Sequence, residues 1–134
     1  MIYFDNAATT YPKPNTVKEM LSLAIDKYGG NPGRSGHDMS LKTAGVVFEC
    51  RQAAAEMFGC ESEDVIFTQN CTMANNLAIK GILEFGDHVL ISDMEHNAVI
   101  RPIEELSRRG VISYDIVETY LNDTQTIRSF EKHI

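Results

Sequence analysis

Asp93-Met94-Glu95-His96-Asn97 is one of two stretches from which the fold can be inferred, and the other is Phe67-Thr68-Gln69-Asn70-Cys71-Thr72. Each follows a short apolar run that indicates a β-strand, and each precedes a segment with helical periodicity. A loop between a strand and a helix N-terminus is where α/β folds hold phosphates and cofactors. One loop carries a Thr and the other a His, so together they predict a site for a phosphorylated, ring-bearing ligand.

The chain around these loops alternates between helical and strand patterns. Apolar residues at helical spacing predict helices over about 15–28, 40–58, from 72, 97–109 and from 121. Short apolar runs predict strands over about 65–68, 88–92 and 111–117. This alternation predicts an α/β fold with a mostly parallel sheet flanked by helices. Because the loops after successive parallel strands share one edge, Thr72 and His96 are expected to lie close together.

Three glycine or capping signals locate the ends of the first two helices. Thr16 and Glu19 have the spacing of a capping box at the start of the first helix. Gly29-Gly30 is expected to end that helix, and Gly59 the second.

Composition and charge exclude several classes of function. Among 134 residues, 43% are hydrophobic and 23% charged, as in ordinary globular domains, and the net charge is −7. This charge argues against nucleic acid or an anionic membrane as a partner. No apolar run approaches the roughly 20 residues that span a bilayer, and the first residues do not resemble a signal peptide. Three cysteines without a C-x-x-C pair indicate neither a disulfide framework nor a metal site, so we expect a reducing, cytoplasmic location.

Several polar residues have both a functional and a structural interpretation. Thr72 can bind an anion at a helix N-terminus, or it can simply cap the helix. His96 can stack on a flat ligand and move protons, or it can be a surface or capping histidine. Arg34 and His37 can bind a carboxylate, or they can belong to an ordinary surface loop. We assign Asp93 and Glu95 no role, because solvated or capping carboxylates are common at such positions.

Four motifs, taken in order, resemble the N-terminal third of a cysteine desulfurase. That family belongs to the class V aminotransferase-like, fold-type I enzymes that use pyridoxal phosphate. The motifs are Tyr3-Phe4-Asp5-Asn6-Ala7-Ala8-Thr9-Thr10 with Pro12, Gly30-Asn31-Pro32 leading to His37, Val65-Ile66-Phe67-Thr68 through Thr72 to Asn75-Asn76-Leu77-Ala78, and Glu95-His96-Asn97-Ala98.

The resemblance implies a pyridoxal phosphate site and assigns residues to it. Thr72, with Asn70 and the N–H groups around Cys71, would bind the cofactor phosphate. His96 would stack on the pyridine ring and help to move protons. Cys71 is interpreted as a phosphate-loop residue and not as a nucleophile. The residues implied near the amino-acid substrate are Asn6, Ala7, Arg34 and His37.

The resemblance also implies a domain organisation and a reaction. Residues 1–14 would be an N-terminal arm, and residues 15–134 the N-terminal part of the pyridoxal phosphate-binding large domain. The implied reaction converts L-cysteine to L-alanine and leaves persulfide sulfur on the enzyme. A homodimer and a sulfur-acceptor protein are the expected partners. The alternatives are another class V aminotransferase, a selenocysteine lyase, or a non-catalytic ligand-binding or assembly module.

The chain lacks parts that the resemblance would require for catalysis. It has no counterpart of the Schiff-base lysine, the aspartate that pairs with the pyridine nitrogen, the persulfide cysteine or the small C-terminal domain. We therefore expect these 134 residues alone to be inactive. We also expect an open sheet edge and uncovered apolar faces, so that the chain dimerises, needs its missing half or is marginally stable.

Overall fold

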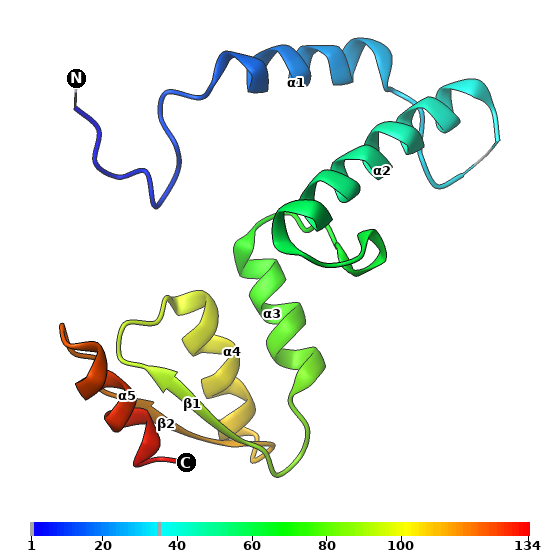
Figure 1. Cartoon of the computed structure of the whole chain (residues 1–134). Helices are drawn as coiled ribbons and strands as arrows, with labels where there is room; N and C mark the ends of the chain where they lie inside the picture. Colours follow the sequence, from blue (N-terminus) through cyan, green and yellow to red (C-terminus); the bar gives the residue numbers. More distant parts are fainter. Residues whose placement is uncertain (1, 35) are drawn as a thin grey trace. The chain divides into compact units, whose positions relative to one another are not determined.

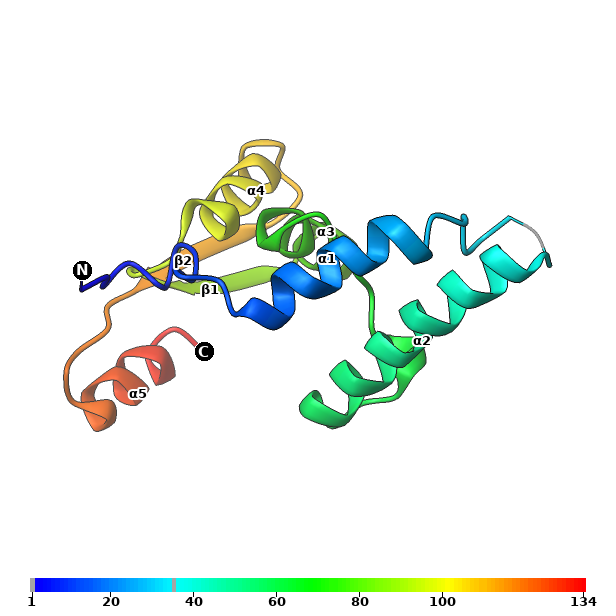
Figure 2. The ribbon, with the colours of Figure 1, turned by 90° about the horizontal axis from the view of Figure 1, so that it is seen from above.

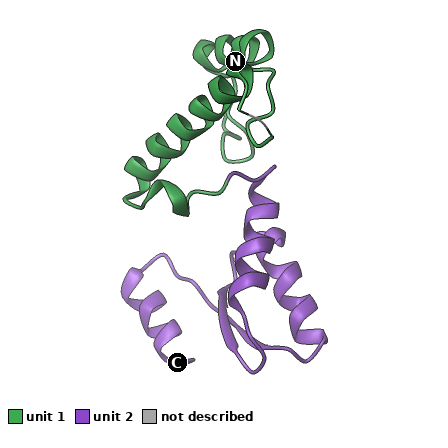
Figure 3. Cartoon of the chain, turned by 90° about the vertical axis from the view of Figure 1, so that its right-hand side faces the viewer, with its two compact units in different colours: residues 1–66 green, residues 67–134 purple. Residues whose placement is uncertain are grey.

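The computed structural model describes residues 2–34 and 36–134 and shows two compact units. The first unit is Met1–Ile66 and the second is Phe67–Ile134 (Figure 3).

The first unit contains two helices, α1 (Asn15–Lys27) and α2 (Asp38–Phe58), and a short 3-10 helix, η1 (Ser62–Asp64) (Figure 1). The predicted capping box at Thr16 is wrong, because α1 begins at Asn15 and has no side-chain cap. Thr16 therefore lies inside the first turn, where its hydroxyl cannot act as the N-cap. The end of α2 is as predicted, since Gly59 follows it with a left-handed φ of 69°.

The loop between α1 and α2 depends on Gly30 for a different reason from the one expected. Neither Gly29 nor Gly30 caps α1, because the C-cap is Tyr28. A Cβ atom on Gly30 would lie 2.6 Å from the carbonyl carbon and oxygen of Met39. The buried Ser40 hydroxyl donates to the carbonyl of Asn31 at 2.7 Å. The loop is thus held against the start of α2.

The second unit is a β-α-β arrangement with two further helices. Its elements are α3 (Cys71–Ile82), β1 (His88–Ser92), α4 (Asn97–Arg108), β2 (Ser113–Val117) and α5 (Asp123–Glu131). The strands β1 and β2 pair in parallel, with His88 opposite Ser113 and Ser92 opposite Val117. Helices α3 and α4 lie on one side of the strands and α5 on the other (Figures 1 and 2).

A compact core holds α3, α4 and the strands together. Ile91, Ile103, Leu106 and Ile112 are buried in one cluster, against which Ile79 and other apolar side chains pack. Ala98, Pro102, Ile103 and Leu106 form the buried stripe of α4. Their spacing follows the helical period, which explains why this segment folds as an amphipathic helix.

The predicted α/β class with a parallel sheet flanked by helices is confirmed, with one strand fewer than expected. Residues 65–68 form no strand, because in the described part of the chain only β1 and β2 pair with each other. The three helices predicted from residues 72, 97 and 121 correspond to α3, α4 and α5. Over residues 2–34 and 36–134, no helix is both long and apolar enough to cross a membrane.

Candidate functional site

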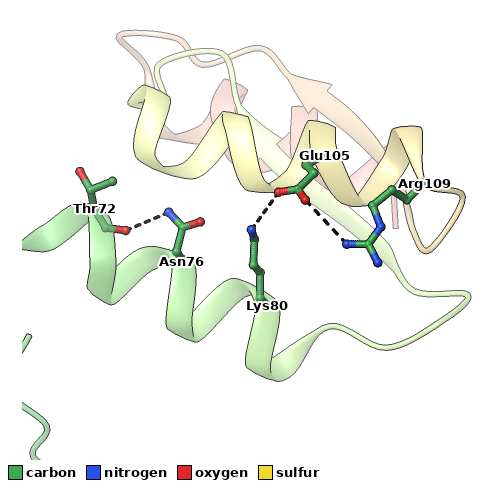
Figure 4. Close-up of polar contacts among 5 residues, drawn as sticks. All are labelled: Thr72, Asn76, Lys80, Glu105 and Arg109. Carbon is green, nitrogen blue, oxygen red and sulfur yellow. Dashed lines mark hydrogen bonds and ion pairs between the residues drawn. The ribbon is translucent and has the colours of Figure 1, made fainter.

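A cavity of about 420 Å³ lies between α3 and α4 in the second unit. The two helices pack side by side and run in the same direction, so both N-termini lie at one end of the cavity (Figure 4). The lining residues are Thr72, Asn76, His96, Asn97, Ala98, Arg101, Pro102 and Glu105.

The N-terminus of α3 provides hydrogen-bond donors at this end. Asn70 caps the helix, with its Oδ1 accepting from the N–H of Met73 at 2.9 Å. Within the described residues, the N–H groups of Cys71 and Thr72 and the Thr72 hydroxyl have no acceptor. Unpaired N–H groups and the positive end of the helix dipole favour an anion here.

Asn76 and Arg101 also line the cavity. Asn76 donates through Nδ2 to the carbonyl of Thr72 at 3.0 Å, which leaves its amide oxygen as an acceptor (Figure 4). Arg101 forms no ion pair with any residue that the structure describes. The guanidinium of Arg101 therefore adds positive charge to the same cavity as the α3 N-terminus.

An ion pair between the two helices marks the far end of the cavity. Lys80 Nζ lies 2.8 Å from Glu105 Oε2, and Arg109 lies 3.7 Å from Glu105 Oε1 (Figure 4). The hydrogen bond from Lys80, and then the charge of Lys80, lower the pKa of Glu105. Glu105 is consequently a paired carboxylate at neutral pH and not a proton donor.

His96 is both a capping residue and a residue of the cavity. Its Nδ1 accepts from the N–H of Ala98 at 3.0 Å and so caps α4. The prediction that Thr72 and His96 lie close together is confirmed, since both line one cavity. The structural cause differs from the expected one, which was a shared edge of two parallel strands. Residues 65–68 are not a strand, and the parallel packing of α3 on α4 brings Thr72 and His96 together instead.

The two carboxylates beside His96 have structural roles. Asp93 accepts from the N–H of Thr119 at 3.1 Å and from its hydroxyl at 2.6 Å. The hydroxyl hydrogen bond from Thr119 lowers the pKa of Asp93. Glu95 accepts from the hydroxyl of Ser92 at 2.8 Å. Both side chains therefore fix the loop after β1.

The remaining residues singled out from the sequence do not line the cavity with their side chains. Cys71 is the exposed first residue of α3, and its Sγ is 3.7 Å from Asn75 Nδ2. Asn6, Ala7, Arg34 and His37 belong to the first unit. Asn6 donates to the carbonyl of Tyr3 and accepts from the N–H of Tyr11, both at 3.2 Å. His37 caps α2, with Nδ1 accepting from the N–H of Ser40 at 3.3 Å.

Sequence reasoning missed Asn76, Arg101 and Glu105 as residues of the cavity. A signal for them is present in the chain, because polar residues recur every four positions on both helices. These residues are Thr72, Asn76 and Lys80 on α3, and Asn97, Arg101 and Glu105 on α4. Residues four apart share one helix face, so each stripe lines the same seam. Across residues 2–34 and 36–134, no cluster of three or more His, Cys, Asp or Glu side chains is placed to hold a metal.

The fold and the cavity define an α/β protein with an anion-favouring helix terminus beside a histidine ring. Residues 2–134 match the family described as aminotransferase class-V, and the chain belongs to that family. The sequence is 36% identical to cysteine desulfurase IscS of Pseudoalteromonas translucida, over 94% of this chain and 33% of that protein. It is 38% identical to cysteine desulfurase IscS of Buchnera aphidicola, over 97% of this chain and 33% of that protein. The chain thus spans about a third of the length of the curated relatives it matches.

Solved structures show the same fold. An apo cysteine desulfurase from Thermococcus onnurineus aligns with a TM-score of 0.78 at 28% identity, over 88% of this chain and 30% of that one. A C-DES variant with glycine covalently linked to its PLP cofactor aligns with a TM-score of 0.69 at 20% identity. That second alignment covers 90% of this chain and 31% of the C-DES chain, and at this identity it supports the fold alone.

Proposed function

We propose that the chain is the N-terminal part of a pyridoxal phosphate-dependent cysteine desulfurase. Residues 15–134 would belong to the cofactor-binding large domain, and residues 1–14 would be its N-terminal arm. The whole protein would convert L-cysteine to L-alanine and retain the sulfur as an enzyme persulfide. The observation that carries this proposal is that Thr72 and His96 line one cavity, at the N-termini of two parallel helices. The two curated relatives, named as cysteine desulfurases, support the choice of reaction.

The donor set of the cavity fits pyridoxal phosphate. The phosphate would be held by the N–H groups of Cys71 and Thr72 and by the Thr72 hydroxyl, while Asn70 fixes the helix start. Arg101 would add positive charge near the phosphate. His96 would place its flat ring against the pyridine ring. When bound, the cofactor supplies an electron sink, and the protein supplies binding and orientation.

Residues of the first unit are proposed to contact the amino-acid substrate. Arg34 is exposed, and a guanidinium matches the geometry of a carboxylate. Asn6 uses its amide to fix the turn of the arm, so it would act by positioning the backbone of Ala7. His37 holds the start of α2 and would lie on the same loop as Arg34.

Homodimerisation and transfer of sulfur to an acceptor protein complete the proposal. Large apolar side chains of the first unit are exposed, among them Leu21 at 61% and Phe58 at 78%. Exposed apolar surface of this kind favours association. Size-exclusion chromatography with light scattering is expected to show a dimer, and a stable monomer would contradict this part of the proposal. Three free cysteines support a cytoplasmic location.

The reaction can be tested on the protein as its native host produces it. We would measure the intact mass, add L-cysteine, and quantify alanine and protein-bound persulfide. Alanine and persulfide formed together are the expected result, with L-serine as the matched substrate without sulfur. Removal of the cofactor should abolish both products. Transamination without persulfide, or turnover of selenocysteine alone, would instead favour another class V activity.

A further inference from the structure

The hydrogen bond between His96 and Ala98 determines which ring nitrogen can meet a ligand. Nδ1 of His96 lies 3.0 Å from the backbone nitrogen of Ala98, which is the second residue of α4. A backbone N–H can only donate, so Nδ1 must offer its lone pair. In a neutral imidazole the other nitrogen then carries the proton, and Nε2 is an N–H donor. Nε2 has no partner among the described residues.

We propose that the backbone N–H of Ala98 is a positioning group that selects, whenever the His96 ring is neutral, the tautomer protonated on Nε2. In this tautomer the ring has a hydrogen-bond donor at Nε2, and its one lone pair, on Nδ1, is already used by Ala98. Because the ligand of the cavity is the cofactor inferred above, this inference rests on the proposed function. A neutral histidine at a helix N-terminus acting as a donor is an established catalytic arrangement in other folds.

The same hydrogen bond limits how His96 can move a proton. To accept a proton at Nε2, the ring must first carry its own proton on Nδ1. The Nδ1–H and the Ala98 N–H would then face each other as two donors, and the bond that caps α4 would break. Proton transfer through Nε2 therefore requires the ring to release Ala98. The hydrogen bond thus links the two roles that the sequence left open for His96, capping a helix and moving protons.

The neighbouring charged side chains leave Nε2 available. Glu105 on α4 is paired with Lys80, and Asp93 and Glu95 on the loop before α4 accept from Thr119 and Ser92. Arg101 also lines the cavity, but its guanidinium has only donors and so cannot accept a hydrogen bond from Nε2–H of His96. None of these contacts supplies His96 with an alternative partner for Nδ1 or Nε2.

The direct test is an NMR measurement on the intact chain labelled with ¹⁵N. Spectra would be recorded at about pH 8, where an ordinary histidine is neutral. We expect a through-hydrogen-bond coupling between the Ala98 amide nitrogen and His96 Nδ1, with the ring proton on Nε2. A ring proton on Nδ1, or no coupling to Ala98, would overturn the inference. His37, whose Nδ1 accepts from Ser40 N–H at the longer distance of 3.3 Å, is an internal comparison.

Two substitutions at His96 distinguish the role of Nδ1, which caps α4, from that of Nε2. In His96→Asn, the amide oxygen can replace Nδ1 as the acceptor from Ala98, because asparagine is a favoured N-cap. In His96→Gln, the amide is placed near the former Nε2, and Ala98 N–H loses its acceptor. Amide exchange at Ala98 should stay slow in His96→Asn and become about fivefold faster in His96→Gln. Equal exchange rates in wild type and His96→Gln would contradict the inference.

Titration of the same sample with pyridoxal phosphate distinguishes this inference from the proposed function. A fixed Nε2–H tautomer without cofactor binding would sustain the inference about the ring and contradict the proposed cofactor site in these 134 residues. Cofactor binding to a chain whose His96 carries its proton on Nδ1 would do the reverse.

Discussion

The two units of the chain differ in how they are stabilised. In the second unit, apolar side chains of α4 and both strands form a buried core that includes Ile91 and Ile103. In the first unit, Ala55 is the one apolar side chain that is buried, within the described residues, and α1 has none. The cavity with Thr72 and His96 lies in the unit with the core.

This difference shows which geometry the chain can maintain by itself. A core fixes helices to within a narrow range of positions, because packed side chains interdigitate with few voids. A helix without buried residues lacks this packing, so its position depends on contacts with surfaces outside its own unit. The α3–α4 cavity is therefore supported locally, whereas Arg34 and His37 lie in a unit that is held by a few polar contacts and one close glycine.

The largest difference between the units is expected on truncating one isoleucine in each. Ile103 is 2% exposed and Ile25 is 80% exposed. Ile103→Ala should lower the free energy of unfolding by about 2–5 kcal/mol, because it leaves a cavity in the core. Ile25→Ala, the matched change on α1, should change it by less than about 0.5 kcal/mol. Urea unfolding followed by circular dichroism measures both, and equal effects would contradict the comparison.

Within the first unit, we expect a clear loss of stability when Gly30 is substituted. In Gly30→Ala the new methyl group would lie 2.6 Å from backbone atoms of Met39, so the loop or α2 must shift. We expect a destabilisation of about 1–3 kcal/mol, as for other overpacked sites. Gly29→Ala is the control, since nothing lies within 4 Å of the position that its new methyl group would take. Amide exchange at Ser40 would show whether the loop has moved, and no difference between the variants would refute the close approach.

A smaller difference in stability is expected between substitutions at the N-termini of α3 and α1. Asn70 caps α3 through its side chain, whereas α1 has no side-chain cap and begins at Asn15. Asn70→Ala should cost about 1 kcal/mol of stability, the usual value for a lost N-cap. Asn15→Ala should be close to neutral. Thermal unfolding of both variants tests this, and a larger loss at Asn15 would reverse the assignment.

The smallest expected effect concerns pH and the contact of Asp93 with Thr119. Because this contact lowers the pKa of Asp93 in the folded state, the unfolded chain binds the proton more readily. The stabilisation is thus complete above the unfolded pKa of about 3.9 and is lost as the pH falls through the lower, folded value. Wild type should exceed Thr119→Val in stability at neutral pH, and this excess should shrink in acid. An excess that grows as the pH falls would contradict the assignment.

Helices were easier to predict from the sequence than strands. A helix satisfies its hydrogen bonds locally, so the apolar rhythm of residues 97–109 was enough to predict α4. A strand needs a partner, and residues 65–68 have strand composition without forming a pair in the described structure. The start of α1 near residue 15 was predicted from the sequence, but Thr16 and Glu19 match a capping box that the helix does not use.

The candidate site was predictable in part for a similar reason. Thr72 and His96 were found because each follows an apolar run at a predicted helix start. Arg101 and Glu105 were missed, since the face that α4 turns toward α3 depends on how the two helices pack. The capping role of His96 was considered, but its Nδ1 contact with Ala98 required the structure.

Binding of pyridoxine phosphate tests most directly whether the α3 N-terminus and His96 form a cofactor site. This compound has the ring and the phosphate but no aldehyde, so it cannot form adducts with surface lysines. Titrations would compare wild type, Thr72→Val and Thr124→Val, since Thr72 and Thr124 are each the second residue of a helix. We predict saturable binding that weakens at least about tenfold in Thr72→Val, as for a lost hydrogen bond to a charged group, and is unchanged in Thr124→Val. No saturable binding, or equal weakening in both variants, would contradict the account.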